Sequence, residues 1–176
     1  MSQLTSINFD KIVYDLKSCY EDAPEIKSLT RTMIYNRLPA QNVIIEDEAS
    51  FTKSSDFEVA ITSKGDWVQT SVSEDKKIVQ GKLTYSNQIL KVTITGTDPI
   101  NIDEVAYTEF GNSFTRVAVK TANLVSYAKI SATFNHHHHH HQSSSNKGSG
   151  GFFFRGAAKW LLHLVLSSAH LRINSG

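Results

Sequence analysis

The stretch YAKISATF, residues 127–134, alternates small or apolar side chains with polar ones. Every second residue therefore shares one face of an extended chain, because successive side chains of a β-strand point to opposite sides. The same period of two recurs in LKVTIT, residues 90–95, and in TRVAVK, residues 115–120. This alternation predicts half-buried antiparallel strands, because the strands of a parallel sheet covered on both faces are apolar throughout.

Outward from this stretch, residues 41–135 contain about seven short segments of the same kind, rich in Val, Ile, Thr and aromatic residues. Turn-forming sequences separate them at residues 64–66, 74–77, 86–88, 96–99 and 110–112. This spacing predicts an antiparallel sandwich or barrel. The acidic run at residues 46–48 lacks the glycine turn of a calcium loop, and we interpret it as a solvated linker ahead of the strands.

The first 40 residues follow a helical period instead. One apolar stripe over residues 8–20 consists of Phe9, Ile12, Val13, Leu16 and Tyr20. A second stripe, ended by Pro39, consists of Ile26, Leu29, Met33 and Leu38. We therefore expect a mainly β protein of the α+β class: a β-domain in residues 41–135 with an N-terminal helix pair in residues 1–40. The helix stripe, through Phe9, Val13, Ile26 and Met33, is a candidate docking surface.

Six consecutive histidines follow the β-domain and are interpreted as an engineered affinity tag rather than a native metal site: His136, His137, His138, His139, His140 and His141. Residues 142–151 have the composition of a flexible Gly/Ser-rich linker. Residues 152–176 form an apolar tail, which we interpret as translated vector sequence or, alternatively, as a fused peptide. The tail is short for a membrane span but suits an interfacial or aggregation-prone segment.

Charge and residue content exclude several functions for residues 1–135. They hold 14 Lys and Arg against 17 Asp and Glu, a formal charge of −3, which gives no electrostatic footprint for nucleic acid. They contain no histidine, which excludes a Ser–His–Asp triad or a Cys–His pair with Cys19. No glycine-rich phosphate loop, bilayer-length apolar run or signal peptide is present. We expect no cofactor, no membrane span and no enzymatic activity.

A family resemblance lies in three segments near the end of the β-domain. They are residues 102–107 (IDEVAY), residues 114–120 (FTRVAVK) and residues 127–134 (YAKISATF). Together, residues 100–134 resemble the closing part of small β-rich modules in bacteriophage tail-fibre, tail-collar and baseplate proteins. The resemblance implies a virion structural subunit, made in the host cytoplasm, that forms a homo-oligomer and docks on other virion subunits.

These observations leave two functions open. The leading expectation is a non-enzymatic phage tail, baseplate, fibre-anchoring or decoration subunit. The alternative is a carbohydrate- or ligand-binding β-module, with Trp67, Tyr85 and Tyr107 as candidate contacts. Trp67, beside the turn at residues 64–66, is a candidate ligand platform, and its other role would be packing in a core or an interface.

Overall fold

The computed structural model describes residues 1–5, 8–37 and 41–136, which form 11 β-strands and one short 3-10 helix. The first elements are β1 (Ser2–Thr5), β2 (Phe9–Asp15), η1 (Lys17–Tyr20), β3 (Ile26–Asn36) and β4 (Asn42–Ser55). The remaining strands are β5 (Glu58–Ser63), β6 (Asp66–Val72), β7 (Ile78–Tyr85), β8 (Gln88–Gly96), β9 (Ile100–Glu109), β10 (Asn112–Thr121) and β11 (Val125–His136).

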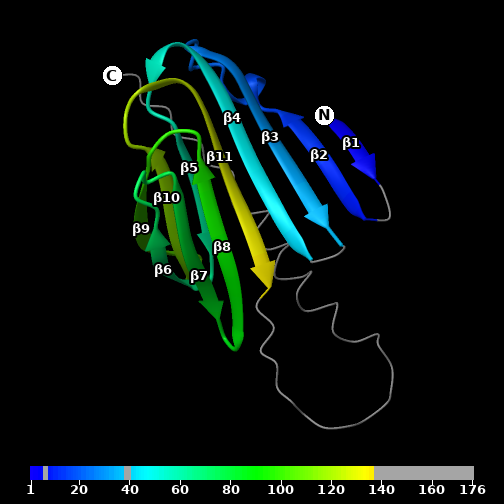
Figure 1. Ribbon diagram of the computed structural model, residues 1–176, viewed down its shortest axis with the longest axis vertical. Coiled ribbons are helices and arrows are strands. Elements are labelled where there is room, and N and C mark those ends of the chain that lie inside the picture. Colours follow the sequence, from blue (N-terminus) through cyan, green and yellow to red (C-terminus); the bar gives the residue numbers. More distant parts are fainter. Residues whose placement is uncertain (6–7, 38–40, 137–176) are drawn as a thin grey trace.

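The strands form two antiparallel sheets, and the smaller sheet lies behind the larger one in Figure 1. The larger sheet has eight strands in the order β1-β2-β3-β4-β11-β8-β7-β6, and the smaller has three in the order β5-β10-β9. Both sheets are open, because the larger one ends at β1 and β6 and the smaller one at β5 and β9. The predicted mainly β, antiparallel fold is confirmed as a sandwich-like arrangement, and the described residues form no closed barrel.

The hydrophobic core lies between the two sheets. Every second residue is buried from Val43 to Phe51 in β4, from Leu90 to Gly96 in β8 and from Ala128 to Phe134 in β11. The smaller sheet contributes Val59, Ile61, Ile100, Val117 and Val119 to the same cluster. Burying such a side chain stabilises the fold by about 1.5–3 kcal/mol before the entropy of ordering the chain is subtracted.

Tight turns set the register of the hairpins. Lys76, Ser86 and Phe110 have positive φ angles of 58°, 55° and 49°, and each lies in a turn predicted from the sequence. Phe110 is followed by Gly111 at φ 76°, so both central residues of that turn are left-handed, as a type I′ hairpin turn requires.

The predicted N-terminal helix pair is wrong. Residues 8–20 form β2 and the four-residue η1, and Ile26–Asn36 forms β3. A spacing of four places Phe9 and Val13 on one face of a strand as well as of a helix, so this spacing does not separate the two. The helix-like spacing of three between Ile26 and Leu29 arises from a β-bulge between Ile26 and Ser28, which lets both residues point into the core.

The acidic run at residues 46–48 is also not a linker. It lies within β4, a 14-residue strand between β3 and β11. Asp47 points into the core, whereas Glu46 and Glu48 point outward. Strands from residues 1–37 and strands from residues 41–136 therefore belong to one continuous sheet.

The last described strand, β11, occupies the middle of the larger sheet. It pairs with β4 on one side, where Ala128 lies opposite Ala49, and with β8 on the other, where Phe134 lies opposite Val92. His136 is its final residue. The other five histidines of the run, the expected linker and the apolar tail lie outside the described residues. Across the described ranges, the structure contains no helix of the length and apolarity needed to cross a membrane.

Candidate binding face of the eight-stranded sheet

The face of the larger sheet turned away from the smaller sheet, called the outer face, carries the residues that alternate with core residues. The strand registers place six of these residues in one row across six neighbouring strands: Phe9, Asn36, Asn42, Asn135, Lys91 and Lys82. We call this set the amide–lysine row. Neighbouring strands lie about 4.8 Å apart, so the row spans roughly 24 Å.

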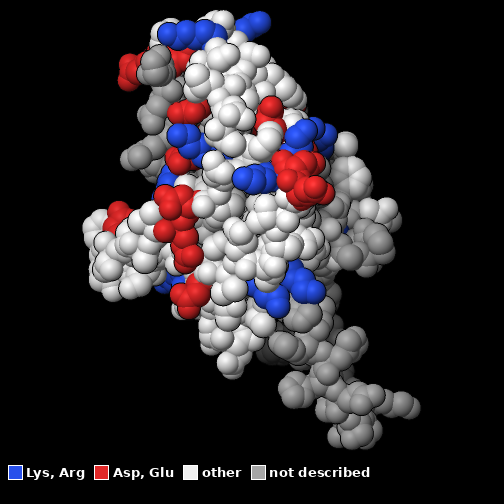
Figure 2. All heavy atoms as spheres, turned by 60° about the vertical axis from the view of Figure 1, so that its left-hand side comes forward, with Lys and Arg blue, Asp and Glu red and all other residues white. Residues whose placement is uncertain are grey.

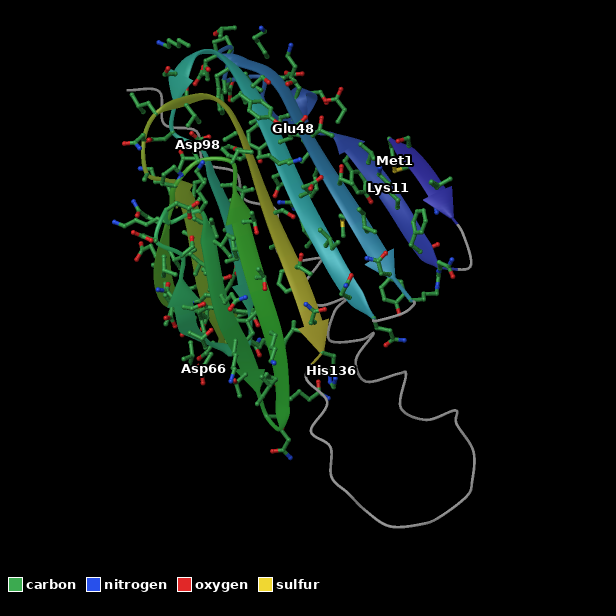
Figure 3. The ribbon with its side chains drawn as sticks, in the orientation of Figure 1. Met1, Lys11, Glu48, Asp66, Asp98 and His136 are labelled. Carbon is green, nitrogen blue, oxygen red and sulfur yellow. The ribbon has the colours of Figure 1, made fainter. Side chains whose placement is uncertain are left out.

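The amide–lysine row crosses the sheet near one end of the sandwich. Figure 3 labels His136, which follows Asn135, and Asp66, at the start of β6, at that same end, whereas Glu48 and Asp98 lie toward the other. Lys91 is exposed and the other five members of the row are partly buried. All six residues therefore retain some exposed surface.

The three asparagines supply uncharged hydrogen-bonding groups. The Nδ2 atom of Asn36 donates to Oδ1 of Asn42 over 2.8 Å, which orders both amides. That bond uses one of two N–H donors on Asn36 and one of two lone pairs on the Asn42 oxygen. Asn135 stands directly opposite Asn42 on β11. The amides thus retain donors and acceptors for hydroxyl groups.

The two lysines of the row face each other across the β7–β8 hairpin, where Lys82 is paired with Lys91. No ion pair within the described residues involves either one. Figure 2 shows basic side chains near the lower end of the described molecule, with acidic side chains to their left and above them on the same face. The row therefore ends in a concentrated positive charge.

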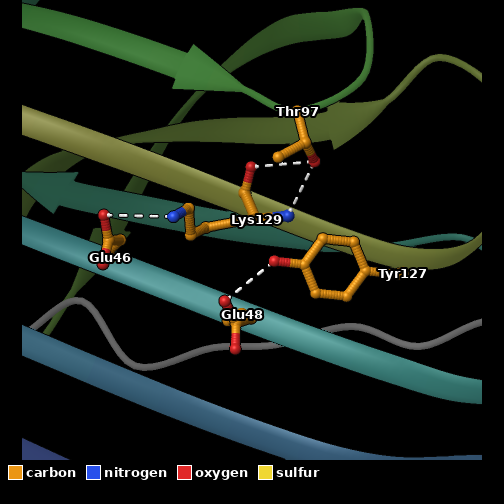
Figure 4. Close-up of polar contacts among 5 residues, drawn as sticks. All are labelled: Glu46, Glu48, Thr97, Tyr127 and Lys129. Carbon is orange, nitrogen blue, oxygen red and sulfur yellow. Dashed lines mark hydrogen bonds and ion pairs between the residues drawn. The ribbon is translucent and has the colours of Figure 1, made fainter.

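A second polar group on the outer face, the carboxylate–tyrosine strip, consists of Glu46, Glu48, Tyr127 and Lys129 (Figure 4). The Tyr127 hydroxyl donates to Oε2 of Glu48 over 2.9 Å, and Nζ of Lys129 lies 3.9 Å from Oε1 of Glu46. The hydrogen bond to Glu48 raises the pKa of the Tyr127 phenol. Glu46, the member of the strip nearest the row, lies four residues from Asn42 along β4, roughly 14 Å away, so the strip and the row are separate.

The interior contains a buried ion pair rather than a reactive centre. Nε and Nη2 of Arg31 donate to the two carboxylate oxygens of Asp47 over 2.7 and 3.0 Å. Burial raises the pKa of the Asp47 carboxyl, while the hydrogen bonds from Arg31 oppose that rise. The pair borders a small cavity of about 20 Å³ whose other walls are apolar core residues. The cavity accommodates about one water molecule and no organic substrate.

The five residues predicted to bind a partner do not form one surface. Phe9 and Val13 lie on the outer face of β2, where Phe9 belongs to the amide–lysine row. Ile26 is 2% exposed in the core, and Met33 packs against the core from the inner face of β3. The predicted helix stripe is wrong, because these residues lie on the strands β2 and β3.

Trp67 is a core residue, with only 7% of its surface exposed. Its ring lies on Gly81, where an added Cβ would come within 2.2 Å of the ring atom Cη2. Tyr85 is exposed at the end of β7, and Tyr107 stacks on Phe114 with 5.4 Å between ring centroids. The three aromatic candidates are therefore placed on three different parts of the sandwich.

Sequence reasoning missed the amide–lysine row, although one signal for part of it was present. The predicted turn at residues 86–88 needed only a two-residue loop, Ser86-Asn87, to place Lys82 opposite Lys91. The asparagines carry no such local signal, because their alignment depends on the pairing of β3, β4 and β11. Residues 1–5, 8–37 and 41–136 contain no group of three or more metal-ligating side chains.

Comparison with known proteins identifies the fold alone. A scan against protein-family models and a search of curated proteins found no match. Among solved structures, the chain is similar to a heparan sulfate lyase HepC mutant from Pedobacter heparinus, at 15% identity and a TM-score of 0.51 over 84% of this chain. It also matches heparinase III, at 10% identity and a TM-score of 0.49 over 77% of this chain. The chain spans 23% and 20% of the lengths of those two proteins.

The expected function as a phage tail, baseplate or decoration subunit is contradicted by this result, because the fold neighbour is part of a heparan sulfate lyase. The virion partners and location stay predictions. The resemblance of residues 100–134 to tail modules stays a sequence observation about the segment that forms β9, β10 and most of β11.

Proposed function

We propose that this protein is a carbohydrate-binding β-module, that its contact surface is the outer face of the eight-stranded sheet, and that it acts by binding rather than by catalysis. The observation that carries the proposal is the amide–lysine row. Sugars present hydroxyl groups that both donate and accept hydrogen bonds, and side-chain amides match them in both directions. At roughly 24 Å the row is long enough for an oligosaccharide rather than a single ring.

The chemistry at the two ends of the row supports the same ligand class. Phe9, at one end, is partly exposed and carries an aromatic ring, the kind of side chain on which the C–H face of a pyranose packs. Lys91 and Lys82 at the other end donate to hydroxyl or acidic oxygen atoms. The fold likeness to part of a heparan sulfate lyase supports a role beside a polysaccharide. Formation of a homo-oligomer stays a prediction, which light scattering tests.

The test compares alanine variants by calorimetric titration with a panel of neutral and acidic oligosaccharides. We expect Asn42→Ala and Asn135→Ala each to weaken binding by about two- to tenfold, the range for one uncharged hydrogen bond. Asn101→Ala is the matched control, because Asn101 is an exposed asparagine on β9 of the smaller sheet. Absence of binding to every member of the panel would overturn the proposal. So would an equal loss in Asn101→Ala.

A further inference from the structure

We infer that the ligand of the outer face is an acidic polysaccharide, whose carboxylate or sulfate groups are bound between Lys82 and Lys91. This inference rests on the proposed function and adds the charge class of the glycan. It starts from an unusual pairing: two lysines stand directly opposite each other on adjacent strands, at the exposed end of the amide–lysine row.

The pairing is unfavourable for the protein alone. Directly opposed side chains in an antiparallel pair have Cβ atoms about 4.5–5.5 Å apart, and like charges at this distance destabilise the sheet. An anion placed between the two ammonium groups turns that repulsion into two attractions. The pairing therefore favours a negative ligand at this place.

The surrounding residues offer little internal neutralisation. The cross-strand neighbours of the two lysines on the outer face are Val68 on β6 and Asn135 on β11, and both are uncharged. The next outward residues along the strands are Gln80, Thr84, Ile89 and Thr93. The nearest acid by register is Asp66, which is diagonal to Lys82, and no ion pair joins the two.

A contrast on the same face strengthens the inference. Lys129, also an outward-facing lysine, is flanked by Glu46 and Glu48 and forms an ion pair with Glu46. The protein thus neutralises a lysine at one end of the outer face and leaves two unneutralised at the other. The continuity of Lys91 with Asn135, Asn42 and Asn36 favours a ligand that carries hydroxyl groups as well as negative charge.

The decisive variant is Lys82→Glu. It replaces a repulsive pair by an attractive one, so we expect its urea midpoint of unfolding to equal or exceed that of the parent protein. At the same time it should weaken binding of an acidic oligosaccharide by at least about tenfold, because a charged hydrogen bond is lost. Lys91→Gln should weaken binding with a smaller gain in stability, because it removes the repulsion without adding an attraction. Lys53→Glu, at the far end of β4, makes the same charge change and should leave affinity unchanged.

The experiment uses the full chain at about pH 8, where histidine is uncharged. The histidine run and the basic tail are identical in all variants, so differences between variants report the row alone. The probes are a sulfated uronate oligosaccharide, an unsulfated uronate oligosaccharide and a neutral oligosaccharide of equal length. The inference is supported if Lys82→Glu and Lys91→Gln weaken binding of the acidic probes and leave binding of the neutral probe unchanged. Weaker binding of the sulfated probe alone identifies sulfate as the bound group, whereas weaker binding of both uronate probes identifies the carboxylate.

The two proposals fail in different ways. Equal binding of neutral and acidic probes, unaffected by Lys82→Glu, would overturn the acidic-ligand inference and leave the carbohydrate-binding function standing. Absence of binding to all three probes would overturn both. Duplex DNA or anionic lipid vesicles bound as tightly as the acidic glycan, with the same loss in Lys82→Glu, would overturn the assignment to a glycan, because the site would then recognise any polyanion.

Discussion

Arg31 and Asp47 face each other on β3 and β4 and form a two-pronged ion pair inside the core, at 2.7 and 3.0 Å. Both side chains are almost fully buried, with 9% and 4% of their surfaces exposed. Each charge is buried beside an opposite charge, which offsets part of the cost of removing it from water. The pair therefore fixes the register of two strands that otherwise present apolar side chains to the core.

Removal of one partner should be severely destabilising. We expect Asp47→Ala to lower the free energy of unfolding by about 3–5 kcal/mol, because the guanidinium of Arg31 stays buried without its counter-charge. Urea denaturation followed by circular dichroism measures the loss. Lys129→Ala, which breaks an exposed ion pair, is the control and should cost less than about 1 kcal/mol. A loss in Asp47→Ala no larger than the control's would contradict the buried pairing.

Replacement of both partners should cost less than removal of one. The double variant Arg31→Met, Asp47→Leu substitutes apolar side chains for the two charges, and the cavity beside the pair gives some room for repacking. Such replacements are often neutral or stabilising because no desolvated charge remains. We expect the double variant to unfold at a higher urea concentration than Asp47→Ala. The reverse order would mean that the ion pair itself contributes net stability.

The contact between Trp67 and Gly81 gives a third prediction. In Gly81→Ala the new methyl group would overlap the indole ring, so Trp67 must move, at a cost of about 1–3 kcal/mol. Adding Trp67→Phe to Gly81→Ala should restore part of the loss, because the smaller ring leaves space for the methyl. Thermal unfolding of the single and double variants tests this compensation. Trp67→Phe alone should leave oligosaccharide affinity unchanged, since the ring is in the core.

The Tyr127–Glu48 hydrogen bond predicts how stability changes at high pH. The pKa of Tyr127 is raised in the folded state, so the unfolded chain loses this proton first as the pH rises. Folded-state stability should therefore fall above about pH 10, the ordinary tyrosine value, until the native phenol also ionises. Urea denaturation from about pH 9 to about pH 12 should show this loss in the parent protein and a smaller one in Tyr127→Phe. Glu48→Gln, which removes the negative acceptor, should behave like Tyr127→Phe.

The β-domain could be predicted from local pattern because its signals agree with one another. In residues 90–95 and 127–134, β-branched or aromatic residues, a period of two and flanking turns all favour the same structure. The positive φ angles of Lys76, Ser86 and Phe110 lie in turns that the sequence indicated. In these stretches each residue's role follows from its immediate neighbours.

The first half of the larger sheet could not be predicted because its signals depend on partners far along the chain. From the sequence alone, Asp47 belongs to an acidic run that is typical of a solvated segment. It is buried because strand pairing places Arg31, 16 residues away, opposite to it. The β-bulge after Ile26 gives this strand the apolar spacing of three that is typical of a helix. The local sequence does not indicate where a bulge will occur. The candidate site has the same origin, because Asn36, Asn42 and Asn135 become neighbours only when three strands pair.

The central position of β11 has a consequence for how the protein is made. Strands β1–β4 and strands β6–β8 form two halves of the larger sheet, and only β11 joins them. Until β11 has been synthesised, β4 and β8 each have one edge whose backbone N–H and C=O groups are unpaired. Such edges pair readily with strands of other chains. The larger sheet is therefore completed only when β11 pairs with β4 on one side and with β8 on the other. Release or cleavage before that step leaves an aggregation-prone fragment rather than a smaller folded domain.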